Sequence, residues 1–379
     1  MSKINPIFAL VMILNLAISL PLITCALFSM LILLEWCNRQ LREQHTLFAF
    51  MLTATLLYVG HYIYFNRAAD LLPLSDILYV SANLTVYPLY LIYIIRLTSK
   101  WRAVYWLMLL PGLLAIMATG TGYIFMTDEE DRMFVHNYLY HNSQTGLTDM
   151  ALFQAYIRQF CKLVFAIEVI ATVVIGSMMI RRYDRMVDEF YADTDDKSMR
   201  NIQSILYLVL TIAILSFIVN IIGRARFTDH EIILTTTSLM FSALLFAIGY
   251  EGLHRHFSII DMRTNKEQVS NDDSAALKDA VNRSMTERII ALVENDKIYL
   301  QPDLKLDDVA QMMHTNRTYI YQAVNQQMGI SFNEFINRYR IAHAKRLMAN
   351  DPTLSMNDVA LLSGFASLSS FYRNMKKYN

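Results

Sequence analysis

Four polar side chains near the carboxyl end of the chain have the types and the spacing needed to bind nucleic acid. They are Arg317, Thr318, Tyr321 and Gln322. Residues three or four positions apart lie on the same face of an α-helix. Guanidinium, amide and hydroxyl groups on such a face can bond base edges or phosphates of double-stranded DNA. The alternative is a hydrated helix face, so the surrounding elements must decide.

A second polar set follows closer to the end of the chain. Its members are Ser367, Ser369, Ser370 and Arg373. We predict the same base or phosphate contacts for this set, again with a hydrated surface as the alternative. Between the two sets, Arg338 and Arg340 either contact phosphates or keep a connecting helix in water.

The first set requires a short helix, a tight turn and a second helix. Apolar side chains at Leu306, Val309 and Ala310 share one face of the first helix. His314-Thr-Asn316 interrupts the pattern, and Asn316 can cap the next helix. Two short helices of this kind, with a polar outer face on the second, predict a helix-turn-helix.

The same pattern returns after a longer helix. Ser331-Phe-Asn-Glu334 is a capping box that opens a helix through about Asn350. Residues 354–365 and 367–377 then predict a second helix-turn-helix. Because a helix over 331–350 is about 30 Å long and one turn of B-DNA is about 34 Å, the two reading helices could enter successive major grooves.

Several motifs in the same order resemble the AraC/XylS-type DNA-binding domain over about residues 284–379. They are Asp307-Asp-Val-Ala310, Gly329-Ile-Ser-Phe332, Arg340-Ile-x-x-Ala-Lys-x-Leu347, Val359-Ala360 with Gly364-Phe365, and Phe371-x-Arg-x-x-Lys-Lys377. The resemblance implies a transcription regulator with two helix-turn-helix units. The front of the chain is similar to the membrane-anchored regulators of that family in architecture only.

Three features depart from that family. Asn325-Gln-Gln327 is neutral where the family usually carries basic residues. Basic residues exceed acidic ones only slightly after residue 300, so counterion release predicts modest non-specific affinity. The chain stops at Asn379, whereas the family continues through a Gly-x-Ser-Pro turn and a last packing helix, and we therefore expect a partly uncovered second unit.

The remainder of the chain is apolar. The whole sequence is 55% hydrophobic and 17% charged, below the roughly 25% charge of ordinary globular proteins. Because a bilayer core takes about 20 helical residues, the long apolar runs predict seven membrane spans. The seven runs are Ile4–Leu34, Thr46–Phe65, Ile77–Ile95, Ala103–Met126, Leu163–Ile180, Ile202–Ile222 and Ile232–Tyr250.

Basic residues are denser in one set of connecting segments than in the other. The richer set is 35–45, 96–102 and 181–201, and the poorer set is 1–6, 66–76, 127–158 and 223–231. The positive-inside rule then puts the amino terminus outside and the carboxyl-terminal part in the cytoplasm. We expect a multi-pass protein of the cytoplasmic membrane.

These patterns predict an all-α chain with a seven-helix transmembrane bundle and a double helix-turn-helix domain. The expected boundaries are 1–250 for the membrane domain, 251–283 for a polar linker and 284–379 for the DNA-binding domain. Ser284-Met-Thr-Glu287 is a capping box and is expected to open the first helix after the linker.

Two ionisable residues lie within the apolar runs. Glu168 is costly in a membrane and is expected to face the bundle interior. There it would either sense a proton, cation or amine, or pair with a neighbour such as Asn83; His61 is a weaker candidate of the same kind. The acidic loop at 128–131, with His136 and His141, reads as hydrated, and no metal site is expected.

The sequence therefore predicts a membrane-bound, sequence-specific DNA-binding transcription regulator that senses a signal through its transmembrane part. The expected partners are promoter DNA, the lipid bilayer, a second copy in a homodimer and an unknown signal ligand. No catalytic motif or cofactor site is apparent, so no enzyme is expected. The alternative is a membrane receptor or transporter with a degenerate tail that does not bind DNA.

Overall fold

The computed structural model describes residues 6–39, 42–194, 197–222, 231–254 and 275–378. These residues form helices and no β-strand; a single isolated bridge joins Tyr191 and Lys305. The chain divides into two compact units. The amino-terminal unit comprises residues 1–180 and 201–256, and the carboxyl-terminal unit comprises residues 181–200 and 257–379.

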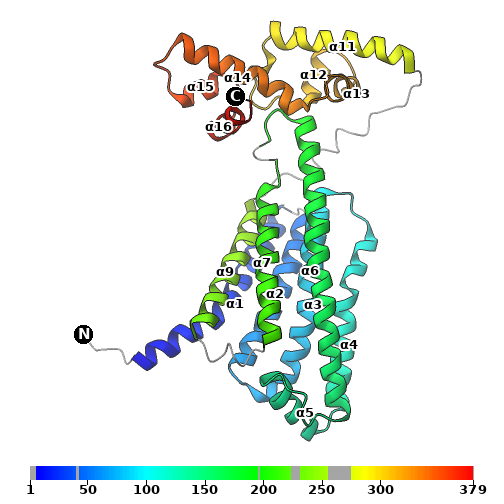
Figure 1. Ribbon diagram of the computed structural model, residues 1–379, viewed down its shortest axis with the longest axis vertical. Helices are drawn as coiled ribbons and strands as arrows, with labels where there is room; N and C mark the ends of the chain where they lie inside the picture. The colour runs from blue at the N-terminus through cyan, green and yellow to red at the C-terminus, as the bar shows by residue number, and fades with distance from the viewer. Residues whose placement is uncertain (1–5, 40–41, 195–196, 223–230, 255–274, 379) are drawn as a thin grey trace. The chain divides into compact units, whose positions relative to one another are not determined.

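Long helices build the amino-terminal unit (Figure 1). They are α1 (Pro6–Arg39), α2 (Arg42–Phe65), α3 (Leu72–Thr98), α4 (Leu110–Phe125), the first part of α6 (Asp149–Phe190), α7 (Arg200–Ile222) and α9 (Glu231–His254). Short elements connect them: η1 (Ala69–Leu71), η2 (Ala103–Leu109), α5 (Asp128–Met133) and the π-helical η3 (Phe134–Tyr140).

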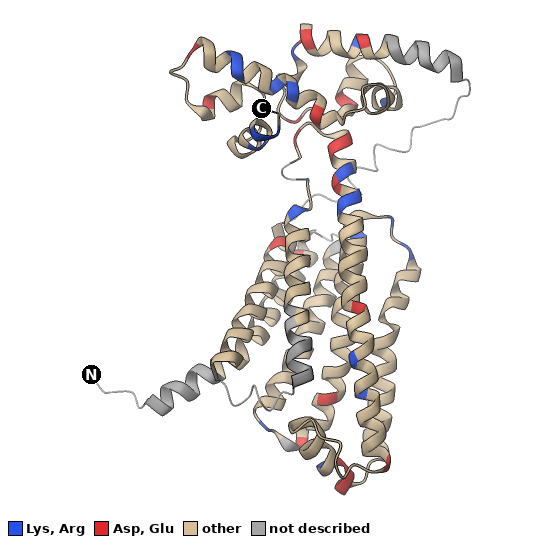
Figure 2. Cartoon of the chain, viewed as in Figure 1, with Lys and Arg blue, Asp and Glu red and all other residues tan. Residues whose placement is uncertain are grey.

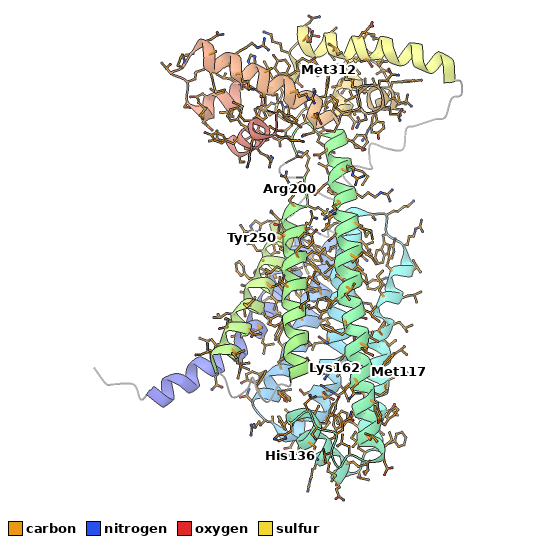
Figure 3. The ribbon with its side chains drawn as sticks, viewed as in Figure 1. Met117, His136, Lys162, Arg200, Tyr250 and Met312 are labelled. Atoms are coloured by element: carbon orange, nitrogen blue, oxygen red, sulfur yellow. The ribbon has the colours of Figure 1, made fainter. Side chains whose placement is uncertain are left out.

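The surfaces of these helices are apolar. Met117 on α4, labelled in Figure 3, and Ile124 on the same helix are both exposed, Ile124 to 78%. Few charged residues mark the length of α1, α3 and α4 (Figure 2). A water-soluble helix would instead carry a polar face opposite its buried one.

Six helical segments among the described residues have the length and apolar composition needed to cross a membrane. They are Asn15–Asn38, Gln44–Phe65, Leu72–Thr98, Ala103–Phe125, Asp149–Phe190 and Ile232–His254. Each overlaps one of the seven expected runs. The other run, Ile202–Ile222, falls on α7, where many side chains lie outside the described residues, so the seventh span stays a prediction.

Helix α6 differs from its expected form. The apolar run predicts a span over 163–180, but α6 continues from Asp149 to Phe190 as one helix of 42 residues. Lys162 and Glu168 do not interrupt it, because lysine and glutamate are good helix formers. The expected inner loop at 181–201 therefore begins as helix.

The carboxyl-terminal unit is a set of shorter helices. They are α11 (Ala275–Asn295), η4 (Ile298–Leu300), α12 (Leu306–Met312), α13 (Arg317–Tyr321), the π-helical η5 (Gln322–Gln327), α14 (Phe332–Asn350), α15 (Met356–Leu362) and α16 (Leu368–Lys377). Helix α11 begins at Ala275, so Ser284 lies inside a helix and does not open one as expected. Of the expected linker, residues 255–274 lie outside the described residues, and 275–283 are helical.

Two apolar cores hold this unit together. The larger joins α11, α12, α13 and η5 to the start of α14, with Val309, Ile320 and Phe332 fully buried. The smaller joins the end of α14 to α15 and α16, with Phe365 and Phe371 at its centre. Each core supports one of the expected reading helices.

Residues 181–200 belong to the carboxyl-terminal unit, although the sequence pattern assigned them to the membrane domain. The backbone N–H of Ala192 donates to the Leu304 carbonyl oxygen (3.1 Å). The carbonyl oxygen of Ala192 accepts hydrogen bonds from the side-chain amides of Asn333 (2.7 Å) and Asn337 (2.9 Å). Because the backbone N–H and carbonyl oxygen of buried Ala192 are both hydrogen-bonded within this unit, the segment around Ala192 is an integral part of it.

Candidate nucleic-acid interface

Helices α12 and α13 and the turn between them position the first polar set. His314 adopts a left-handed conformation (φ 49°) in the turn, and Asn316 caps α13 by accepting a hydrogen bond from the Thr318 N–H (3.1 Å). Ile320 and Val324 are buried, as the sequence predicts. The cap and the turn therefore match the expected helix-turn-helix geometry at this site.

The four side chains of the first polar set are only half-exposed. Arg317, Thr318, Tyr321 and Gln322 are all intermediate in burial. Neighbouring Tyr319, Gln326 and Gln327 are more exposed, although the helical pattern does not single them out. Helical periodicity identifies the buried face of a helix. It does not indicate whether a distant segment packs on the polar face.

That second segment is the end of α6. The Arg317 guanidinium lies over the Phe190 ring, 4.0 Å from its centroid, and Arg317 Nε pairs with Asp307 Oδ1 at 3.3 Å. The Tyr321 ring stacks on Phe190 with centroids 5.7 Å apart. These contacts bring two of the predicted DNA-contacting side chains against α6.

Tyr321 also bonds to the same helix. Its hydroxyl donates to Glu189 Oε2 at 3.4 Å. Burial raises the pKa of Tyr321, and the neighbouring Glu189 carboxylate raises it further. The hydroxyl therefore stays protonated at neutral pH and acts as a hydrogen-bond donor, here toward a carboxylate and in principle toward a phosphate.

Helix α14 connects the two polar sets. Ser331 caps it by accepting from the Glu334 N–H (3.1 Å), as the capping box predicts. The helix has 19 residues, which corresponds to a length of about 28 Å at ~1.5 Å per residue. Exposed Arg338 pairs with Glu334 one turn earlier (2.5 Å), so its side chain is held along the helix surface.

Arg340 has a structural role that its position in the sequence does not reveal. Its side chain is fully buried and donates to the carbonyl oxygens of Tyr299 (2.7 Å), Gln301 (2.5 Å) and Pro302 (3.1 Å). Burial lowers the pKa of Arg340 to about 10, with nearby carboxylates opposing the shift. Because it cannot reach solvent, Arg340 neither contacts phosphate nor hydrates α14, and both expected roles are corrected.

The second polar set is split by burial. Ser367 caps α16 by accepting from the Ser370 N–H (3.1 Å), and its hydroxyl lies 2.9 Å from that of Ser369. Ser369 is exposed and Arg373 is half-exposed, whereas Ser370 is buried with 3% exposure. Lys376 and Lys377 are exposed in the last turn of the same helix. The accessible polar groups of α16 are therefore Ser369, Arg373 and the two lysines.

The two candidate sensing residues lie apart in the amino-terminal unit. Glu168 is on α6, and neither of its buried carboxylate oxygens has a hydrogen-bond partner within the described part of the chain. His61 is on α2, where its Nδ1 lies 3.3 Å from the Leu57 carbonyl oxygen and its ring lies against Tyr79. His61 lines a cavity that Glu168 does not. Among the described residues, no group of three or more metal-ligating side chains comes together.

Comparison with known proteins bears on the carboxyl-terminal unit. Residues 309–379 match a protein family described as helix-turn-helix domain. The uncharacterized HTH-type transcriptional regulator YtdP of Bacillus subtilis (strain 168) is 28% identical over 106 residues. Uncharacterized HTH-type transcriptional regulators of Staphylococcus aureus strains COL and MSSA476 are each 30% identical over 83 residues.

Each match covers only a small part of this chain and of the related protein. They cover 28% of this chain and 13% of the Bacillus protein, and 22% of this chain and 11% of each staphylococcal protein. No solved structure matches the chain. The similarities support a helix-turn-helix domain in the carboxyl-terminal unit.

Proposed function

We propose that this chain is a membrane-bound transcription regulator that binds promoter DNA in a sequence-specific manner through two helix-turn-helix units. The unit formed by α12 and α13 supplies Arg317, Thr318, Tyr321 and Gln322. The unit formed by α15 and α16 supplies Ser367, Ser369 and Arg373. The amino-terminal helices anchor the protein in the cytoplasmic membrane and receive a signal.

The observation that carries the DNA-binding proposal is the arrangement around α14. Two capped reading helices, α13 and α16, pack near its opposite ends through separate apolar cores. A connecting helix of about 28 Å compares with a turn of B-DNA of about 34 Å. This spacing suits two helices that enter successive major grooves, and the family match covers both helices.

Length, apolar composition and loop charge support the membrane part. Six segments among the described residues are long enough and apolar enough to cross a bilayer, and they carry exposed aliphatic side chains that water would not favour. The basic segments 35–45, 96–102 and 181–201 would lie in the cytoplasm, with the amino terminus outside. That orientation delivers the carboxyl-terminal unit to the side where DNA is found.

A homodimer completes the proposal. Residues 300–379, which hold both helix-turn-helix units, carry only a small excess of positive charge, so a single copy gains little from counterion release. Two copies held in one membrane would bind adjacent sites with a high effective concentration.

DNA binding is tested with the intact protein. Genome-wide crosslinking in the encoding organism should enrich a small set of promoters. The purified full chain in nanodiscs should then bind the enriched sequence in fluorescence anisotropy. The double variant Thr318→Ala with Gln322→Ala should lower the ratio of specific to non-specific affinity at least tenfold, because each good base contact contributes about 1–3 kcal/mol of discrimination.

The matched control replaces two exposed residues of α11, Glu287→Ala with Arg288→Ala, and should leave this ratio unchanged. A full chain that enriches no promoter would support the degenerate-tail alternative. Topology is tested separately with reporter fusions after Tyr378. An extracytoplasmic location for that fusion would exclude the membrane arrangement proposed.

A further inference from the structure

A cavity of about 300 Å³ lies inside the amino-terminal unit. Side chains from α1, α2, α3, α6, α7 and α9 line it. An apolar cavity of about 150 Å³ is large enough to hold one benzene molecule. The cavity of this unit, which we call the bundle cavity, therefore has room for a molecule with two such rings.

Aromatic rings from different helices meet in the wall of the bundle cavity. Three ring pairs line it, with these distances between centroids: Phe50 and Tyr90 (5.5 Å), Tyr58 and Phe241 (6.3 Å), and Tyr87 and Phe165 (5.2 Å). The pairs join α2 to α3, α2 to α9 and α3 to α6, so tertiary packing holds the rings in place. Such a wall favours an aromatic guest, because contacts between aromatic rings contribute more than their buried area alone.

Two aliphatic hydroxyl groups of the wall already bond to backbone carbonyls. The Ser238 hydroxyl donates to the Ala17 carbonyl oxygen. The Thr237 hydroxyl donates to the Ile233 carbonyl oxygen at 2.8 Å. Neither hydroxyl needs a ligand to satisfy its donor, so neither indicates which polar group a ligand would carry.

Asn83, on α3, differs from these two residues. Its side chain lines the bundle cavity, and its amide makes no hydrogen bond to another described residue. A carboxamide without a partner is costly in apolar surroundings. Because the amide nitrogen is a donor and the amide oxygen is an acceptor, a carbonyl or hydroxyl group on a ligand would satisfy it. Asn83 is therefore the polar point at which a ligand would be oriented.

The two cationic side chains of the wall are already engaged within the protein. Arg158 forms an ion pair with Asp76, and Lys162 also interacts with another part of the chain. The remainder of the wall is mainly apolar and aromatic. An ionised ligand would lose its hydration in such surroundings at a high cost in free energy. The wall therefore favours a ligand without charge.

We propose that the bundle cavity binds a small neutral molecule with two aromatic rings and one carbonyl or hydroxyl group. The rings lie among the tyrosine and phenylalanine side chains, and the oxygen bonds to Asn83. This inference deepens the signal-receiving part of the proposed function and rests on that proposal for the bilayer environment. It differs from the proton, cation or amine expected at Glu168, because Glu168 is not among the residues that line the cavity.

The test measures equilibrium binding of radiolabelled benzophenone to the full chain in phosphatidylcholine nanodiscs. Benzophenone is neutral and consists of two phenyl rings joined by a carbonyl group. Empty nanodiscs give the background from partition into lipid. Binding should be saturable, and near-ultraviolet irradiation should attach the bound probe to a peptide that contains a cavity residue such as Met240.

Two analogues separate the contribution of the oxygen from that of the rings. α-Phenylstyrene has a CH₂ group in place of the carbonyl oxygen and should compete about fivefold more weakly, as expected for the loss of one hydrogen bond. Dicyclohexyl ketone keeps the carbonyl group without aromatic rings and should also compete about fivefold more weakly. Both comparisons use the wild-type chain, so they do not depend on the folding of a variant.

Variants test the same two features. Asn83→Leu should bind benzophenone and α-phenylstyrene equally, because the hydrogen bond to the carbonyl oxygen is lost. Ala54→Leu should weaken binding of both probes by filling space, because Ala54 is buried and lines the cavity. Asn15→Leu, at an exposed residue of α1 outside the cavity wall, is the matched control and should bind both probes as the wild type does.

Three results with the wild-type chain would overturn the proposal. They are the absence of saturable benzophenone binding, equal competition by α-phenylstyrene, and attachment of the probe only to peptides outside the cavity wall. Equal competition by dicyclohexyl ketone would also overturn it, since an aliphatic guest such as a lipid chain would then fit the cavity equally well. None of these measurements contains DNA, so their failure is distinct from a failure of promoter binding.

Discussion

The guanidinium carbon of Arg317 lies 4.0 Å from the centroid of the Phe190 ring. Arg317 begins the helix expected to enter the DNA groove, and Phe190 ends α6, the longest of the described helices. The same ring stacks on Tyr321, whose hydroxyl bonds to Glu189. If these side chains contact DNA, they must first leave α6.

Removal of the Phe190 ring should therefore strengthen DNA binding. In Phe190→Ala, Arg317 and Tyr321 are free to turn toward the duplex without breaking a cation–π contact of about 0.5–2 kcal/mol. Affinity of the full chain for its promoter should rise by roughly twofold to thirtyfold in fluorescence anisotropy. Phe190→Tyr keeps the ring and is the control. Weaker binding by Phe190→Ala would mean that α6 supports the reading helix and does not compete with DNA.

Gly364 should be intolerant of a side chain. Its φ is +83°, and a Cβ there would lie 2.5 Å from the Tyr299 carbonyl oxygen and 2.7 Å from the Leu300 Cα. Left-handed strain of about 1–2 kcal/mol adds to a clash with backbone atoms, so Gly364→Ala should destabilise the carboxyl-terminal unit by about 2–4 kcal/mol.

Gly329 is the matched control for Gly364. Its φ is +68°, but a Cβ there meets nothing within 4 Å. Gly329→Ala should therefore show only the left-handed strain, about 1 kcal/mol. Pulse proteolysis of the full chain in increasing urea measures both variants. If both variants lose the same free energy of unfolding, the close approach of residue 364 to residues 299–300 does not affect stability.

Arg340 should matter for folding and Arg338 should not, although they are two residues apart on α14. Loss of the buried guanidinium leaves three backbone carbonyls unsatisfied, at about 1–3 kcal/mol for a buried polar group. Arg340→Met should therefore lower the free energy of unfolding by about 3–5 kcal/mol. Arg338→Met removes an exposed ion pair with Glu334 and should cost less than about 0.5 kcal/mol.

The same proteolysis assay distinguishes the two arginines. If Arg338→Met lowers DNA affinity without a change in stability, Arg338 contacts phosphate. Unchanged stability in Arg340→Met would contradict the structural role given to that side chain.

His343 should make the carboxyl-terminal unit less stable in mild acid. Burial lowers the pKa of His343, and the neighbouring cations Arg346 and Lys297 lower it further. Because the folded pKa lies below the unfolded value of about 6.5, the unfolded chain binds more protons in this window. The stabilising contribution is present above pH ~6.5 and is lost as pH falls through the folded pKa.

His343→Gln, which stays neutral, should therefore lose less stability than the wild type when pH falls from about 7.5 to 5. Urea midpoints from pulse proteolysis at each pH give the comparison. Parallel curves for the two proteins would place the acid sensitivity at other groups. His314→Gln, at an exposed turn residue, is a control for substitution of a histidine as such.

Local pattern was sufficient for much of the carboxyl-terminal unit. The caps at Asn316 and Ser331 were predicted from residue type and spacing, and both form as expected. Such bonds join residues two or three positions apart, so sequence alone carries the information. Helix α11 is the exception: Ser284 has the cap signature, yet the helix begins at Ala275.

The long apolar runs also identified the long helices of the amino-terminal unit, because helix formation and apolar composition are properties of each segment by itself. The apolar pattern did not predict where these helices end. Helix α6 runs past Ile180 to Phe190 because its last turns are charged but still helix-forming, and an apolar-run criterion stops at the first arginine.

The sequence by itself determined the helical segments, their caps and the polar faces, since these depend on neighbours within a few positions. Tertiary structure alone decided which of those faces are free. Arg340 is buried by carbonyls 38–41 residues away, and Tyr321 meets a carboxylate 132 residues away. No local periodicity encodes such pairs, because the free energy of burial depends on which distant segment packs on a face.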